Sequence, residues 1–289
     1  MSNLSKTVIA GAKVLNIKNN ESKRFKTPKR TGGECTKNKF SILINKKERI
    51  IDDRVVLTLD TKKCNGNHII FLHGGAYTEE ALVFHRLFIE KLVLFCNYRV
   101  SFIDYPLAPE STALETLNMV IDSYEYLLGE YRDAFHFIGD SAGGGLVLSI
   151  LMLIREKGLK VPNKNVLISP WLDISLSNCE IKEYEDSDTF LSKTALINIG
   201  NKYVGELDIK DYRVSPIYGN LNNLNDLMVF VSTNEIFYPD CIKLNDLVKK
   251  ADKTSMELEV FDEMFHDFVM APLKESIKAI DKINKFIRE

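Results

Sequence analysis

The sequence predicts an α/β protein built on a mostly parallel, eight-stranded sheet, with helices on both faces and an additional helical cap. The first observation behind this prediction is the order of the segments along the chain. Short apolar runs alternate with longer amphipathic stretches along most of the chain, the pattern of strands joined by helical crossovers. The second is size, since 289 residues with 45% hydrophobic content suffice for one large domain.

Eight runs are expected to be strands. Several are apolar without alternation, which is typical of strands covered on both faces in a parallel sheet. The first two runs are close enough in sequence to form an antiparallel start. The expected strands are residues 40–45, 54–59, 68–73, 98–104, 134–139, 165–170, 226–232 and 256–262.

Amphipathic stretches with apolar residues at helical spacing lie between these strands. We expect helices at residues 114–128, 144–155, 237–250 and 272–287. Two stretches interrupt the alternation, and we expect both to form the cap, because an insertion after a late strand lies at the ligand-binding edge of an open sheet. The predicted division is 1–39 and 175–222 for the cap, with 40–174 and 223–289 for the core.

Composition excludes several classes of function. A net charge of −2, from 38 basic and 40 acidic residues, argues against nucleic acid as a partner. Five scattered cysteines without a CxxC pair argue against a zinc site or a disulfide framework, and they fit a reducing compartment. No apolar run is long enough to cross a bilayer or to form a secretory signal. We therefore expect a cytoplasmic protein with no metal and no stable membrane insertion.

The stretch FIGDSAGGG places Ser141 between an expected strand and an expected helix. A tight strand-to-helix turn strains the serine backbone, and the neighbouring Gly139 and Gly143 leave room for it. The hydroxyl would then project at a helix N-terminus, where backbone N–H groups favour developing negative charge. These features predict Ser141 as a nucleophile; a glycine-rich turn capped by serine is the alternative.

A second glycine-rich stretch, HGGAY at residues 73–77, ends the third expected strand. Acyl transfer needs N–H donors aimed at the oxyanion, and small residues let the backbone approach the substrate. The residue after the nucleophile supplies another donor. The predicted oxyanion donors are Gly75, Ala76 and Ala142, with Gly74 as an alternative to Ala76.

Three motifs in order resemble the signatures of the hormone-sensitive-lipase-like family of α/β-hydrolases, whose usual forms are HGGG, YxLAPE and GDSAGG. Here they read HGGA, YPLAPE and GDSAGG, beginning at His73, Tyr105 and Gly139. The resemblance covers about residues 40–289. It implies an α/β-hydrolase fold and an esterase or lipase-like enzyme that needs no cofactor and acts on a small-molecule ester.

The resemblance also implies roles for the residues around these motifs. His73 would orient the oxyanion loop, and Asp140 would support the nucleophile turn within its motif. Tyr77 is a candidate for shaping the substrate pocket. The sequence departs from the family at Ala76, which replaces the third glycine, and its methyl group would narrow the acyl or alcohol pocket.

The remaining triad members follow from chain order, which in α/β-hydrolases is serine, acid, histidine. His266 lies after the last expected strand, whereas the other histidines fall in strand, helix or oxyanion-loop positions and are not expected to be catalytic. Glu235 follows the strand at 226–232, in the context where the family places its acid. Asp240 is the alternative acid.

The sequence thus predicts a serine carboxylesterase for short to medium acyl esters, working through an acyl-enzyme and a Ser-His-Glu triad. An amidase or formamidase with the same triad, or a non-catalytic ligand-binding relative, are the alternatives. The last expected strand would leave an edge open to pairing, so a monomer or a homodimer is expected.

The N-terminal 39 residues hold ten basic side chains and two acidic ones. They could attract anionic substrates or a membrane surface. We favour a solvated cap over the active site, because apolar residues repeat there at helical spacing: Leu4, Val8, Ala12 and Leu15.

Overall fold

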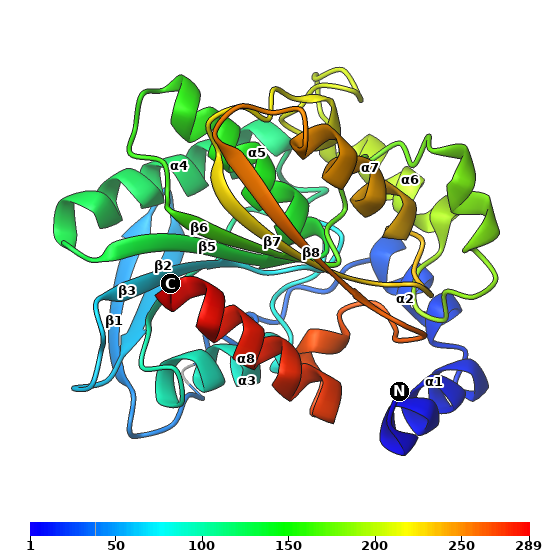
Figure 1. The fold of residues 1–289 in the computed structure, drawn as a ribbon, viewed down its shortest axis with the longest axis horizontal. Coiled ribbons are helices and arrows are strands. Elements are labelled where there is room, and N and C mark those ends of the chain that lie inside the picture. The colour runs from blue at the N-terminus through cyan, green and yellow to red at the C-terminus, as the bar shows by residue number, and fades with distance from the viewer. Residues whose placement is uncertain (38) are drawn as a thin grey trace.

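The computed structural model describes residues 1–37 and 39–289. Residue 38, inside the segment expected to belong to the cap, lies outside the described residues. One eight-stranded sheet runs through the molecule in the order β1-β2-β4-β3-β5-β6-β7-β8 (Figure 1). β2 pairs antiparallel with both neighbours and every other pairing is parallel, which confirms the predicted mostly parallel α/β sheet. The strands are β1 (Asn45–Ile51), β2 (Arg54–Asp60), β3 (Asn67–Leu72), β4 (Arg99–Ile103), β5 (Ala134–Asp140), β6 (Lys164–Ile168), β7 (Asn225–Ser232) and β8 (Thr254–Phe261).

Helices cover both faces of the sheet, with α4, α5 and α7 on one side and α3 and α8 on the other (Figure 1). The buried apolar residues accordingly divide into two clusters, one under each layer. The helices are α1 (Asn3–Val14), α2 (Ile17–Lys26), α3 (Val83–Leu94), α4 (Ala113–Glu130), α5 (Ala142–Glu156), α6 (Lys193–Tyr203), α7 (Tyr238–Val248) and α8 (Lys274–Arg288). Short 3₁₀ helices occur at Cys179–Glu183, Pro216–Tyr218 and Phe268–Met270.

The first expected strand, 40–45, is wrong. That apolar run forms a turn, with Ile42 98% exposed, and the strand is the polar stretch that follows it. Asp52 and Asp53 have positive φ values of 48° and 59°, as a two-residue hairpin turn requires, and this turn sets the pairing of β1 with β2. β1 is an exposed edge strand, so its position depends on the turn and not on apolar content.

The N-terminal segment forms α1 and α2, and α2 packs beside α6 from the 175–222 segment (Figure 1). The expectation that its apolar residues all cover the active site is wrong for two of the four. Ala12 is buried and Val8 packs against the core, but Leu4 and Leu15 are exposed. No helix among the described residues is long and apolar enough to span a bilayer.

Candidate active site

Ser141 stands at the tight turn between β5 and α5. Its backbone is strained, with φ 52° and ψ −120°. The Ser141 amide donates to the carbonyl of Ile168 (2.8 Å) and the Ser141 carbonyl accepts from the amide of Trp171 (2.9 Å), so backbone bonds on both sides hold the turn. A side chain at Gly143 would overlap the carbonyl oxygen of Leu72, which is why this position requires glycine.

Three side chains from separate loops form one chain of hydrogen bonds. His266 Nε2 lies 3.0 Å from Ser141 Oγ, and His266 Nδ1 lies 2.7 Å from Glu235 Oε2. Ser141 follows β5, Glu235 follows β7, and His266 lies in the loop after β8. The carboxyl ends of parallel strands share one edge of the sheet, and this brings the three residues together.

Glu235 is fully buried, and its second oxygen is also bonded. Oε1 accepts from Ser169 Oγ (2.9 Å) and from the amide of Ser232 (2.6 Å), so the carboxylate cannot rotate freely. Asp240, the alternative acid, lies in the first turn of α7 and accepts from Asn178 Nδ2 (3.0 Å). Of the two carboxylates, Glu235 is therefore the one in contact with His266.

A second carboxylate, which the sequence did not single out, also contacts the imidazole. Asp267 Oδ2 lies 3.1 Å from His266 Nε2, the nitrogen that faces Ser141. Burial alone would lower the pKa of His266, but the carboxylates of Asp267 and Glu235 outweigh it and hold this pKa well above its ordinary value. Burial in turn raises the pKa of Asp267 to about 6.

The loop after β3 turns through three consecutive positive φ values, at Gly75 (112°), Ala76 (52°) and Tyr77 (59°). The backbone N–H groups of Gly75, Ala76 and Ala142 have no acceptor within residues 1–37 and 39–289. The Gly74 backbone helps to lower the pKa of the Asp140 carboxyl. Gly75, Ala76 and Ala142 thus keep free donors.

His73 supports this loop from within the core. Its ring stacks on Tyr105 (centroids 4.5 Å apart), and its Nδ1 donates to the carbonyl of Gly74 (2.6 Å). Burial lowers the pKa of His73 to about 3, so the ring is neutral at physiological pH. The hydroxyl of Tyr105 donates to the carbonyl of His73 and thereby links the YPLAPE segment to the loop.

His85 has a larger structural role than its position in a helix suggested. Its Nδ1 accepts from the amide of Leu82 (2.8 Å), so the proton is on Nε2, which donates to Asp140 Oδ2 (3.1 Å). Burial opposes ionisation of Asp140, but His85 and the Gly74 amide lower its pKa. Asp140 thereby joins α3, the nucleophile turn and the loop after β3.

Tyr77, expected to shape a substrate pocket, is itself buried. Its ring stacks on Tyr203 of α6, with centroids 3.7 Å apart and planes 2° apart, and tilts against Trp171. Since α6 belongs to the 175–222 segment, this segment supports the loop after β3 directly.

A further buried carboxylate, missed by sequence reasoning, ties the 175–222 segment to the Glu235 loop. Asp188 Oδ1 accepts from the amides of Phe190 (2.9 Å) and Leu191 (2.8 Å), and Oδ2 accepts from the amide of Ile236 (3.1 Å). Lys18 of α2 donates to the carbonyl of Asp188 (3.2 Å). No sequence motif marks this residue, because two of its partners, Ile236 and Lys18, lie far from it in the sequence.

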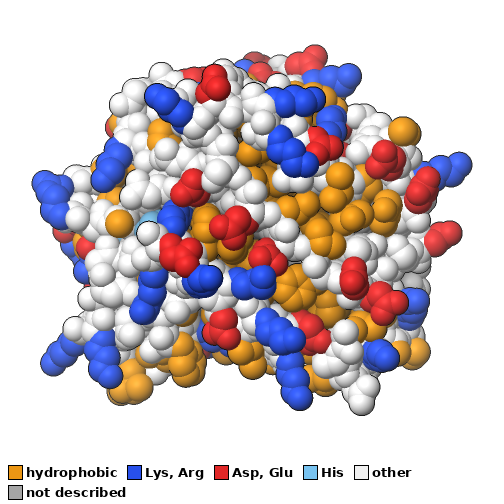
Figure 2. All heavy atoms as spheres, in the orientation of Figure 1, with side chains coloured by type: hydrophobic (Ala, Val, Ile, Leu, Met, Phe, Trp, Pro, Cys, Tyr) orange, Lys and Arg blue, Asp and Glu red, His pale blue; other side chains and the backbone are white. Residues whose placement is uncertain are grey.

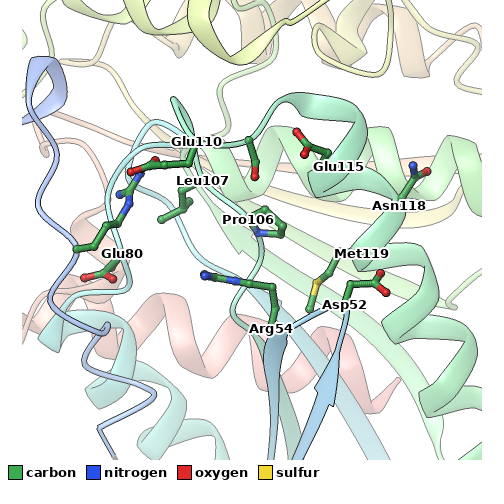
Figure 3. Close-up of a pocket in the computed structure, with 11 residues that line it drawn as sticks. Asp52, Arg54, Glu80, Pro106, Leu107, Glu110, Glu115, Asn118 and Met119 are labelled. Carbon is green, nitrogen blue, oxygen red and sulfur yellow. The ribbon is translucent and has the colours of Figure 1, made fainter.

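A separate cavity of about 560 Å³ lies beside the Pro106–Leu107 turn (Figure 3). Arg30 on its wall donates to the carbonyl of Ala108 and pairs with Glu110 (2.6 Å). Arg54 pairs with Asp104 (2.8 Å). Both arginines that line this cavity are thus paired with carboxylates. Within the described residues, no group of three or more metal-ligating side chains occurs.

Comparisons with known proteins show the family to which this chain belongs. The chain matches the model of the alpha/beta hydrolase fold family over residues 69–270. It is 30% identical to an esterase of Acinetobacter venetianus over 224 residues, which cover 75% of this chain and 73% of that protein. It is 28% identical to an acetyl-hydrolase of Streptomyces hygroscopicus over 228 residues, covering 78% and 76%.

A solved esterase from the bacterial hormone-sensitive lipase family is also similar in structure. The TM-score is 0.84 with 25% identity, and the alignment covers 100% of this chain and 98% of the other. The chain therefore belongs to the α/β-hydrolase fold family and resembles its hormone-sensitive-lipase-like esterases.

Proposed function

We propose that this protein is a serine carboxylesterase that hydrolyses short to medium acyl esters through an acyl-enzyme intermediate. Its family and relatives make it a hydrolase of ester bonds. One observation supports the proposed acyl-enzyme mechanism. A chain of hydrogen bonds runs from Ser141 through His266 to Glu235, next to three backbone N–H groups without acceptors. The name of the acetyl-hydrolase relative favours a short acyl group.

In the proposed reaction, Ser141 Oγ attacks the ester carbonyl carbon while its proton passes to His266 Nε2. Glu235 holds the Nδ1–H tautomer and stabilises the imidazolium. The oxyanion is bound by the N–H groups of Gly75, Ala76 and Ala142, and each such donor contributes about 3–4 kcal/mol of transition-state stabilisation. His266 then protonates the leaving alcohol, and water, deprotonated by the same imidazole, hydrolyses the acyl-enzyme.

In this proposal the segments 1–39 and 175–222 form the cap above the site. The contact of α2 with α6 and the bond from Lys18 to the Asp188 carbonyl support it, because both join the two segments to each other. The cap would close the pocket over the acyl chain, and the methyl group of Ala76 would narrow the pocket at the loop after β3.

The test is hydrolysis of p-nitrophenyl acetate, butyrate, octanoate and palmitate by the wild type and by Ser141→Ala. We expect turnover of the shorter esters and a loss of roughly a million-fold in kcat in the variant. A fluorophosphonate should label the wild type at Ser141. Equal rates in both proteins without labelling would contradict the proposal, and labelling combined with hydrolysis of amides only would indicate an amidase.

A further inference from the structure

α1 presents apolar side chains to solvent. Leu4, Val14 and Leu15 are 54%, 85% and 65% exposed. With 3.6 residues per turn, Leu15 lies about 20° and Val14 about 80° from Leu4 around the helix axis, so the three share one side of α1. The same spacing had suggested that Leu4 and Leu15 would be covered.

The side of α1 that lies next to Leu4 and Leu15, and opposite Val14, is fixed to the body of the protein. Ser5 Oγ donates to Glu275 Oε2 (3.0 Å) at the start of α8, and Ser2 Oγ donates to the same oxygen (3.0 Å). Val8 and Ile9 pack against the core cluster under α3 and α8. Val14 thus points outward from a docked helix, and Leu4 and Leu15 lie exposed at the edge of its buried side.

Basic side chains lie along one edge of this surface, on the side of Val14 that is away from Leu4 and Leu15. Lys6 and Lys13 lie about 80–100° around the helix from Val14. Together with Lys23 and Lys26 of α2 they are exposed, and their ammonium groups have no ion pair or hydrogen bond within the part of the chain that the structure describes. Figure 2 shows basic and apolar side chains together at the lower right, where Figure 1 places α1.

Charge is segregated between this segment and the rest of the chain. Residues 1–39 hold ten basic and two acidic side chains, whereas the remaining 250 residues hold 28 basic and 38 acidic ones. An anionic surface would attract the first part and repel the second, and so would orient the molecule with α1 and α2 toward it.

We propose that α1 docks this protein on an anionic lipid surface, with Leu4, Val14 and Leu15 inserted among the headgroups and the lysines contacting lipid phosphates. An exposed apolar helix side with lysines along one edge is similar to the pattern of helices that lie in the membrane interface. The charge segregation selects an anionic surface, and the exposed apolar side chains fit insertion among lipid headgroups. Because α2 follows α1 and packs beside α6, docking also brings the 175–222 segment near the interface.

Co-sedimentation with vesicles tests this docking, comparing 70:30 phosphatidylcholine:phosphatidylglycerol with pure phosphatidylcholine. We expect the wild type to bind the anionic vesicles and to be released by salt. Lys6→Glu/Lys13→Glu should weaken binding at least about 25-fold. Leu4→Ser/Val14→Ser/Leu15→Ser should weaken it more than about tenfold. Lys62→Glu/Lys63→Glu, which makes the same charge change in the exposed β2–β3 loop, should bind like the wild type.

Three results would overturn the proposal: no binding of the wild type to anionic vesicles at low salt, wild-type binding by the triple serine variant, or equal weakening by the control pair. A wild-type dimer that the serine variant converts to a monomer in size-exclusion chromatography would instead assign this surface to a second copy. Circular dichroism and hydrolysis of soluble p-nitrophenyl butyrate show that each variant folds. Ser141→Ala should bind vesicles like the wild type, which separates docking from the proposed catalysis.

Discussion

Glu235 and Asp240 lie five residues apart, yet only the first contacts His266. Glu235→Gln keeps the shape of the side chain but removes the charge that stabilises the imidazolium. We expect kcat for p-nitrophenyl butyrate to fall on the order of 10⁴-fold, as for other triads that lose their acid. Asp240→Asn should change kcat by less than about tenfold, because Asn178 and not His266 is its partner. The reverse ranking would make Asp240 the acid.

The contact of Asp267 with His266 predicts how the activity depends on pH. His266 must be neutral to accept the Ser141 proton, so activity rises as pH rises through the pKa of His266. Asp267 holds that pKa high, and Asp267→Asn removes this negative charge. The acidic limb of the kcat/KM profile should therefore move to lower pH, with a larger share of the activity retained at pH 6. Asp262→Asn makes the same charge change at an exposed position in this loop and serves as control. An unmoved limb in Asp267→Asn would contradict the assignment.

The sequence predicts residues whose roles depend on local context. Ser141 is marked by its strand–turn–helix setting, and Glu235 and His266 by chain order, and the structure brings all three into contact. Asp267 and His85 were not predictable in this way. Their influence depends on which atoms they approach across the fold, at 3.1 Å in each case, and no spacing rule encodes that distance.

At the scale of elements, Asp188 couples the 175–222 segment to the loop that carries Glu235. In Asp188→Asn the side-chain NH₂ would face the N–H of Ile236 and leave a buried donor without an acceptor. Such a loss costs about 1–3 kcal/mol. We expect a Tm lower by several degrees and a fall in kcat larger than the change in KM, because Glu235 would lose its position.

The neighbouring Asp186 provides the matched control, since it is exposed in the same segment. Asp186→Asn should leave both Tm and kcat near the wild-type values. If Asp188→Asn lowers Tm but leaves kcat intact, Asp188 stabilises the segment without positioning Glu235.

The periodicity of apolar residues predicts the boundaries of the buried strands but not those of the exposed edge strand. β3, β5, β6 and β7 are buried on both faces, and their apolar runs locate them within one or two residues. β1 is an edge strand without a buried face, so its sequence carries no such signal. The position of β1 is set instead by the hairpin turn at Asp52 and Asp53, which both have positive φ.

At the scale of the whole molecule, the fold class followed from the order of the elements, because alternating strands and helices admit few topologies. The exposure of Leu4 and Leu15 did not follow. Helical spacing shows which residues share a side of α1, but the side that meets the body is decided by contacts such as Ser5 with Glu275, far away in the sequence.

The stacking of Tyr77 on Tyr203 has a consequence for chimeric enzymes. Exchanging the 175–222 segment between homologues is a natural way to try to change the substrate range of such proteins. Here the exchange would also remove the aromatic partner of a residue in the strained loop after β3, where Gly75, Ala76 and Tyr77 all have positive φ. A transplanted insertion without an aromatic ring at the position of Tyr203 would thus alter turnover as well as selectivity. We therefore expect turnover and selectivity to change together in such an exchange.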